Sequence, residues 1–139
     1  MADERRPFDV SLVTPDGAAY EGEAVMLIVP GAAGEIGVLA RHAPLVATLK
    51  AGSTRVHLQG GEVQEYATGP GFFKVEQDRA IALVDDAQQA SEIDVAEARR
   101  QLETAQADLE RLDPGADRWM LEQRVKHAET LLAVAGGPG

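Results

Sequence analysis

The strongest constraint on the fold of this chain is a single change in the spacing of its apolar residues, close to residue 90. Residues 7–86 contain short apolar or alternating runs separated by turn signals, such as Pro15-Asp16-Gly17. From residue 95 onward, apolar residues instead recur every three or four positions. Alternation is the spacing of a strand with one buried face, whereas the three-four repeat is that of an amphipathic helix. The sequence therefore predicts a β domain followed by helices.

The β part, residues 1–86, has the pattern of an antiparallel sandwich or barrel. Its clearest element is a hairpin in which two alternating segments, residues 55–59 and 62–66, flank Gly60 and Gly61. Many short strands joined by glycine-rich turns are typical of sandwiches and barrels. No helical stretch lies between these strands, so we do not expect the parallel sheet of a βαβ fold.

Two amphipathic helices are predicted after residue 90, separated by the turn sequence Asp-Pro-Gly-Ala-Asp at 113–117. Heptad-like apolar seams of this kind pack two helices against each other. The N-cap of the first helix is predicted at Ser91, with Asp94 also favourable near that N-terminus. The first seam comprises Val95, Ala98, Leu102, Ala105, Leu109 and Leu112, and the second comprises Leu121, Val125, Ala128, Leu132 and Ala135.

Alanine is frequent in both seams, which limits the apolar area that the two helices bury against each other. At about 25 cal/mol per Å² of buried apolar surface, a short alanine-rich hairpin has little stability of its own. We therefore expect the helical hairpin to dock on the β domain or on a partner, and to be able to move.

Composition excludes several classes of function. The chain has no cysteine, which removes disulfides, thiol nucleophiles and cysteine-ligated zinc. Acidic residues outnumber basic ones 23 to 13, and both the β part and the helical part are net acidic. Binding to nucleic acid or to anionic lipid is therefore not expected. No apolar run is long enough to span a bilayer, and the N-terminus lacks the apolar core of a signal peptide, so a cytosolic chain without membrane insertion is predicted.

No catalytic or metal-binding constellation is recognisable. The histidines at 42, 57 and 127 lack the spacing of metal ligands, and His42 is expected to hydrogen-bond a turn backbone. Asp85 and Asp86 are adjacent, so in a strand their carboxylates would face opposite sides, and we expect them to end the strand.

The serines and glycine-rich segments give the same result. None of Ser11, Ser53 and Ser91 lies in a G-x-S-x-G sequence. The segments 31–37 and 69–73 match neither a Walker loop nor a dinucleotide fingerprint, so we interpret them as tight corners between strands. The chain is expected to be a binding or coupling component.

Residues 34–52, GEIGVLARHAPLVATLKAG, resemble the signature of the epsilon subunit of F-type ATP synthases, with its G-E-(I/L)-G, H-A-P-L and K-x-G elements. The likeness continues on both sides of this segment. Residues 8–37 resemble the N-terminal strands of the family, residues 66–87 its G-G-x-x-x-V segment, and residues 92–103 the start of its C-terminal hairpin. The resemblance implies a sandwich of about ten strands, here residues 1–86, followed by a regulatory antiparallel two-helix hairpin at 87–139.

The resemblance also implies a function. This family is a non-catalytic part of the rotating central stalk, which binds the gamma subunit and rests on the membrane c-ring. It couples proton flow to ATP synthesis as a peripheral component at the cytoplasmic face of the bacterial cell membrane. When its hairpin extends, it contacts the catalytic alpha and beta subunits and can inhibit ATP hydrolysis.

Two sets of residues can be assigned from the signature. Gly34, Glu35, Ile36 and Gly37 correspond to the family's c-ring contact loop, in which the two glycines are expected to permit backbone angles that other residues resist. His42, Ala43 and Pro44 correspond to a structural corner.

The nucleotide motif of the family is altered in this chain. Many members bind ATP on the hairpin through I/L-D-x-x-R-A, and Ile93, Asp94 and Ala98 match that pattern. However, Glu97 occupies the arginine position, where an acid repels a triphosphate. Arg99 and Arg100 are the candidate substitutes, but they project from other helical faces. We therefore expect no ATP cofactor.

The resemblance assigns an inhibitory role to basic hairpin residues that meet acidic segments of the catalytic subunits. The candidates here are Arg111, Arg118, Arg124 and Lys126, although a basic stripe is often simply a solvated helix face. Two other functions stay open. A nucleotide-responsive binding module is suggested by the partial ATP motif, and an enzyme is supported only by scattered histidines and acids.

Overall fold

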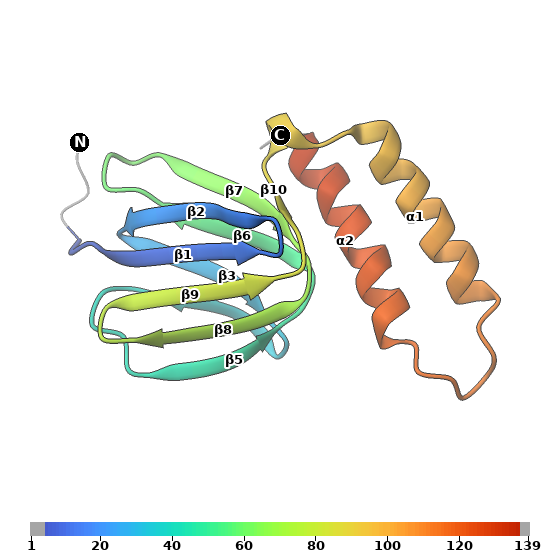
Figure 1. The fold of residues 1–139 in the computed structure, drawn as a ribbon, viewed down its shortest axis with the longest axis horizontal. Helices are drawn as coiled ribbons and strands as arrows, with labels where there is room; N and C mark the ends of the chain where they lie inside the picture. Colours follow the sequence, from blue (N-terminus) through green and yellow to red (C-terminus); the bar gives the residue numbers. More distant parts are fainter. Residues whose placement is uncertain (1–4, 137–139) are drawn as a thin grey trace.

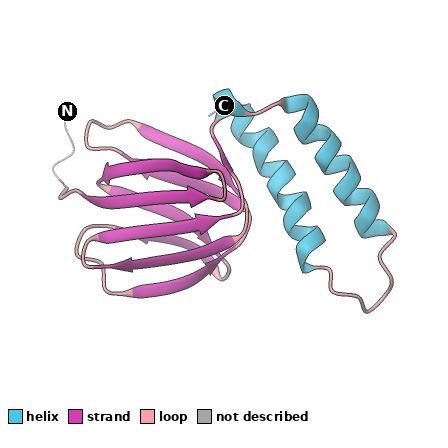
Figure 2. Ribbon diagram, viewed as in Figure 1, coloured by secondary structure: helices cyan, strands magenta, loops and turns pink. Residues whose placement is uncertain are grey.

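The computed structural model describes residues 5–136 and contains a β domain followed by a pair of helices (Figures 1 and 2). Residues 1–4 and 137–139, which fall in the predicted sandwich and hairpin, lie outside the described residues. The strands are β1 (Phe8–Thr14), β2 (Gly17–Ala24), β3 (Met26–Gly31), β4 (Gly34–Val38), β5 (Leu45–Leu49), β6 (Gly52–His57), β7 (Val63–Thr68), β8 (Gly71–Glu76), β9 (Arg79–Val84) and β10 (Ala87–Gln88). They are followed by the short 3₁₀ helix η1 (Ala90–Glu92) and the helices α1 (Val95–Glu110) and α2 (Trp119–Ala135).

The ten strands run in the order β10-β7-β6-β3-β5-β8-β9-β1-β2, and β4 pairs with β3. This arrangement confirms the predicted β-sandwich with its C-terminal helical hairpin. One pairing differs from the antiparallel arrangement that the sequence predicts: β1 and β9 are parallel neighbours. Their parallel pairing is possible because almost the whole domain lies between them in sequence. The pairing of β10 with β7 continues the sheet to Gln88, past the predicted boundary at residue 86.

The core of the sandwich comes from alternate positions of the strands, as the period-two pattern requires. In β1, for example, Phe8, Val10 and Leu12 are buried. Tyr66 and Phe73 are the largest fully buried side chains, and the Tyr66 hydroxyl donates to Gln64 Oε1 at 2.8 Å. Burial of the ring raises the pKa of Tyr66 to about 12. Two opposed apolar faces thus enclose one core.

The predicted hairpin around Gly60 and Gly61 is confirmed. β6 and β7 pair antiparallel along their whole length, and Gly61 adopts a positive φ of 94°. The connection is closed by a hydrogen bond from the Leu58 N–H to the Glu62 carbonyl at 2.8 Å. The two glycines therefore form the turn that their sequence indicates.

The first helix begins later than predicted. The N-cap is Asp94, whose carboxylate accepts the Glu97 N–H at 3.1 Å, whereas Ser91 lies within η1. The prediction of Ser91 as the cap is wrong because a separate 3₁₀ turn intervenes, in which the Glu92 carboxylate accepts the Gln89 N–H at 2.9 Å. A carboxylate at the N-cap satisfies a helical N–H that has no partner within the helix.

The two helices are antiparallel, and α2 lies between the sandwich and α1 (Figure 1). α1 packs against α2, and α2 packs against β6, β7 and η1. A small apolar cluster joins the two parts of the molecule through Ala67 of β7, Ala98 of α1, and Leu131 and Val134 of α2. The hairpin is thus docked on the sandwich chiefly through α2.

Candidate interaction surfaces

The segment Gly34-Glu35-Ile36-Gly37 is a strand and not the loop that its glycines indicate. It forms most of β4 and pairs with β3, so that Pro30 is opposite Glu35 and Gly31 is opposite Gly34. Glycine at 34 is required by a positive φ of 141°. Gly37 adopts no positive φ and has open space where a Cβ would stand, so the prediction that its backbone angles require glycine is wrong.

Glu35 is exposed on this strand and is held by a basic partner. Its carboxylate lies 3.0 Å from Arg55 Nη2 on β6, and 60% of the Glu35 side chain is accessible. An exposed pair of this kind contributes little to stability. The ion pair instead orients the Glu35 carboxylate, which stays accessible to another molecule.

At the corner formed by His42, Ala43 and Pro44, the expected contact of His42 with a turn backbone is present. His42 Nδ1 lies 2.6 Å from the Ala43 carbonyl oxygen, to which a protonated Nδ1 donates. Just before the corner, Arg41 has a φ of 65°, and its N–H donates to Asp78 Oδ1 at 2.5 Å. This second contact could not be predicted from the sequence, because it links the corner to the distant turn between β8 and β9.

An exposed apolar surface lies on the outer face of three neighbouring strands. Val46 of β5, Phe72 of β8 and Leu83 of β9 are 71%, 63% and 52% exposed, and we call these three residues the apolar strip. Phe72 is directly opposite Leu83 in the β8–β9 pair. The alternation of Phe72 with the buried Phe73 was the available signal for an outward aromatic residue. Clustered exposed apolar residues mark interaction sites on soluble proteins.

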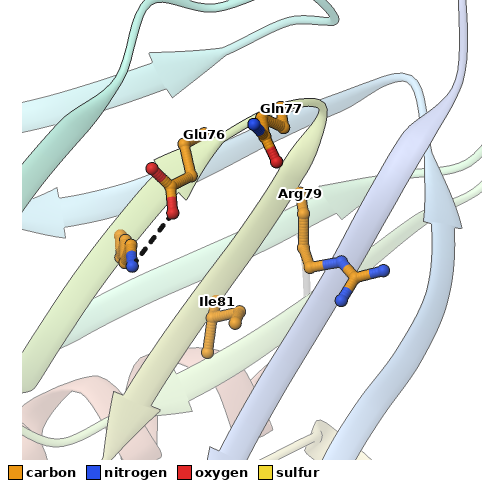
Figure 3. Close-up of a pocket in the computed structure, with 5 residues that line it drawn as sticks. Glu76, Gln77, Arg79 and Ile81 are labelled. Atoms are coloured by element: carbon orange, nitrogen blue, oxygen red, sulfur yellow. Dashed lines mark ion pairs between the residues drawn. The ribbon is translucent and has the colours of Figure 1, made fainter.

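The apolar strip is bordered by charge on the same strands. A shallow hollow of about 390 Å³ is lined by Lys74, Glu76, Gln77, Arg79 and Ile81. Figure 3 shows Glu76 and Gln77 at the end of the β8–β9 hairpin, with Arg79 and Ile81 following along β9. Lys74 Nζ and Glu76 Oε1 form an ion pair of 3.0 Å. The surface therefore has an apolar part and a polar margin, like the core and rim of a protein interface.

The residues of the altered nucleotide motif have structural roles. Asp94 caps α1, Ala98 is buried, and Ile93 packs against the small apolar cluster. The Glu97 carboxylate forms an ion pair with Arg100, whose Nε lies 3.0 Å from Glu97 Oε2. This hydrogen bond to the carboxylate raises the pKa of Arg100.

A hollow of about 420 Å³ between the two helices brings Arg100 and Arg124 together, with Glu97 also in its wall. Both guanidinium groups have acidic partners, because Arg124 Nη1 lies 3.4 Å from Asp108 Oδ2. Arg99 is exposed and does not line this hollow. The structure therefore brings two cations together but neutralises each with a carboxylate.

The four basic residues proposed for inhibition do not form one stripe. Arg111 follows α1 and pairs with Asp108 at 2.6 Å, whereas Arg118 precedes α2. Arg124 faces α1, but Lys126 lines a different hollow, of about 790 Å³, between α2 and the sandwich. A partner cannot meet all four on a single face of the docked hairpin.

The junction between α2 and the sandwich contains two polar contacts that the sequence did not indicate. Gln123 Oε1 accepts the Ala51 N–H at 2.6 Å, and His127 Nε2 lies 2.8 Å from Asp86 Oδ2. The hydrogen bond from His127 lowers the pKa of Asp86. The pKa of the neighbouring Asp85 shifts in the opposite direction, because burial raises the pKa of its carboxyl group.

Within residues 5–136, no cluster of three or more histidine, aspartate or glutamate side chains is arranged to hold a metal ion. Over the same residues, neither helix is long and apolar enough to cross a membrane.

The chain is similar to ATP synthase proteins along most of its length. A family model of the beta-sandwich domain of the ATP synthase delta/epsilon chain matches residues 7–90. The ATP synthase epsilon chain of Rubrobacter xylanophilus is 38% identical over 141 residues, covering 97% of this chain and 96% of the relative. That of Dichelobacter nodosus is 35% identical over 125 residues, covering 90% and 85%.

Solved structures give the same result. A chain in the cryo-EM structure of OSCP, F1 and c-ring of Euglena gracilis mitochondrial ATP synthase has a TM-score of 0.75 at 26% identity, covering 91% of this chain and 80% of that one. A chain in the central stalk and c-ring structure of the Tetrahymena thermophila enzyme has a TM-score of 0.55 at 13% identity and shows the same fold. The epsilon chain is a structural and regulatory subunit of the complex, not its catalytic one. The relatives, the family match and the fold together show that this chain belongs to the epsilon-chain family of ATP synthases.

Proposed function

We propose that this chain is a rotor subunit of the central stalk, which couples proton flow through the membrane c-ring to ATP synthesis. Membership of the epsilon-chain family supports the role, and the apolar strip is the observation that carries it. A coupling subunit must hold its partners firmly while it transmits rotation. Large exposed apolar side chains on a rigid sheet face provide such an attachment.

The partner proposed for the apolar strip is the gamma subunit. Phe72 and Leu83 lie side by side on neighbouring strands, so that one apolar segment of gamma can cover both. The charged margin formed by Lys74, Glu76 and Arg79 would then surround the contact as a polar rim.

The second partner proposed is the c-ring, which Glu35 meets from the β3–β4 hairpin. Its carboxylate is largely accessible although paired with Arg55, so a basic group of the ring can compete for it. In this arrangement the chain is peripheral, at the cytoplasmic face of the bacterial cell membrane, and inserts no segment into the bilayer.

Binding to the matching gamma subunit tests this function. Phe72→Asp and Leu83→Asp are each expected to weaken gamma binding roughly thirty-fold, the effect of losing about 2 kcal/mol at an interface hot spot. Val63→Asp is the matched control, because Val63 is 46% exposed but lies on β7, away from the strip. Equal binding by all three variants would exclude the strip as the gamma surface, and no binding by the unaltered chain would exclude the rotor role.

The hairpin is proposed to regulate ATP hydrolysis only when it leaves the sandwich and reaches the catalytic alpha and beta subunits. Arg100, Arg111 and Arg124 are paired with acids of the hairpin itself. Contact with an acidic segment elsewhere must first break these pairs. Because these pairs lie within the hairpin, they persist after it leaves the sandwich, and we expect inhibition by the released hairpin to be weak.

ATP is not proposed as a ligand of the hairpin. Glu97 places a carboxylate in the hollow that contains Arg100 and Arg124, so the local charge is unfavourable for a triphosphate. Titration calorimetry with millimolar ATP is expected to show no binding. Glu97→Arg restores the family motif and frees Arg100, and it is expected to produce a measurable binding heat. Binding by the unaltered chain would instead favour the nucleotide-responsive module.

A further inference from the structure

Helix α2 has a second face beyond the seam that packs against α1. Gln123, His127, Leu131 and Val134 are spaced four, four and three residues apart, which places them on one side of a helix. All four contact the sandwich or belong to the cluster that joins it. The half of this face nearer the C-terminus is apolar, and the half nearer the hairpin turn is polar.

The polar half is attached to the sandwich at two separate points. Ala51 lies between β5 and β6, is fully buried, and its N–H donates to Gln123 Oε1 at 2.6 Å. Asp86 lies between β9 and β10, and its carboxylate accepts from His127 Nε2–H at 2.8 Å. A buried backbone N–H needs a hydrogen-bond partner, and for Ala51 that partner comes from the hairpin.

The same junction contains features that oppose permanent docking. Its apolar part is small, because Ala67 and Ala98 contribute only single methyl groups beside Leu131 and Val134. In addition, His127 Nδ1 is buried without a hydrogen-bond partner in the part of the chain that the structure describes. A buried polar atom of this kind costs free energy that is recovered when water reaches it.

We propose that Gln123 and His127 form a ligand-independent latch that sets how often the hairpin leaves the sandwich. When both hydrogen bonds break, the remaining small apolar cluster holds α2 only weakly, and α1 leaves with α2 because the helices pack together. The latch acts without nucleotide, since its contacts lie within the chain. This inference rests on the proposed regulatory function of the hairpin and names the contacts that control it.

Amide hydrogen exchange of the full chain tests the latch, because the Ala51 N–H is released when the hairpin opens. His127→Ala is expected to accelerate exchange at Ala51 about ten-fold, the effect of losing a hydrogen bond to a charged group. The Ala51–Gln123 bond itself is unchanged in this variant, so acceleration reports opening of the whole junction. Asp86→Asn is expected to act in the same direction, and His127→Gln, which keeps a donor, is expected to restore part of the protection.

Two controls make the result decisive. Glu122→Ala alters an exposed residue of the same helix and is expected to leave the exchange rate of the Ala51 amide unchanged. Amides of the β6–β7 ladder report global unfolding, and in the unaltered chain the Ala51 amide is expected to be less protected than they are, because the hairpin opens without unfolding the sandwich. Unchanged exchange at Ala51 in His127→Ala, or protection of the Ala51 amide as high as that of the ladder in the unaltered chain, would overturn the latch. Gamma binding measured on the same variants distinguishes this failure from failure of the rotor function, since the apolar strip is unaltered in them.

Discussion

At the residue scale, Asp85 and Asp86 are neighbours in sequence, yet their surroundings change their pKa values in opposite directions. Asp86 accepts hydrogen bonds from His127 and from Gln88 Nε2, both at 2.8 Å, and its pKa is lowered. Asp85 is packed against the backbone of Gly69, where burial raises its pKa. The two carboxylates therefore affect stability differently, and both follow the end of β9 at Val84, as expected from the sequence.

Asp86→Asn is expected to make the free energy of unfolding less dependent on pH. A carboxyl group whose pKa is lowered in the folded state stabilises the fold above its ordinary pKa of 3.8, and this contribution is lost as the pH falls through the lowered value. The unaltered chain should therefore be more stable than the variant near neutral pH, and the difference should shrink below 3.8. Urea unfolding over a pH series measures it, and a difference that does not change with pH would contradict the assignment.

Gly71→Ala is expected to destabilise the sandwich strongly. A Cβ at Gly71 would lie 1.8 Å from the carbonyl oxygen of Leu83 on the paired strand, so β8 and β9 would have to separate. Overpacking of this kind costs about 1–3 kcal/mol, and more where backbone must move. Gly37→Ala is the control, because open space surrounds that position, and it is expected to change stability by less than about 0.5 kcal/mol. Urea unfolding of both variants provides the comparison.

At the element scale, Asp94→Ala is expected to destabilise α1 by about 1 kcal/mol, the usual effect of removing an N-cap side chain. The Asp94 carboxylate accepts the Glu97 N–H, whereas Ser91 lies outside the helix. Ser91→Ala should therefore leave helix content and thermal stability unchanged. Circular dichroism during thermal unfolding checks both variants, and a larger loss in Ser91→Ala would reverse the assignment of the cap.

The elements that the sequence predicts correctly are those in which one pattern dominates. Alternation identifies the β6–β7 hairpin, and the three-four repeat identifies both helices, because local burial determines these patterns. The two glycines of residues 34–37 indicate a turn, whereas pairing with β3 makes this segment the strand β4. Tertiary pairing of this kind overrides a local propensity.

The second face of α2 could not be predicted for a related reason. Gln123 and His127 are polar, so a search for apolar periodicity assigns them to solvent. Their partners, the Ala51 N–H and the Asp86 carboxylate, are 72 and 41 residues away in sequence. Alternation with Lys74 and Glu76 indicates an outward Phe72, but the apolar strip as a whole cannot be predicted, because the register of β5, β8 and β9 brings Val46 and Leu83 beside Phe72.

At the scale of the whole molecule, the proposed functions fall on different parts of the chain. The sandwich attaches the chain to its rotor partners, and the hairpin regulates ATP hydrolysis. The apolar strip and Glu35 lie on the sheet, so movement of the hairpin leaves both in place. The latch contacts lie on α2 and on the loops that follow β5 and β9. The same chain can therefore stay on its rotor partners while its hairpin changes position.

This division leads to a prediction about ATP hydrolysis by a matching catalytic core that lacks this subunit. The unaltered chain and a Gln123→Ala/His127→Ala double variant should bind the core equally, because both keep the apolar strip. The double variant should slow hydrolysis more, since every ten-fold increase in the released hairpin population raises apparent inhibition by up to about ten-fold. Glu122→Ala should behave as the unaltered chain. If the double variant binds but inhibits no more strongly, release of the hairpin does not regulate hydrolysis, and the latch serves only to hold the helices on the sandwich.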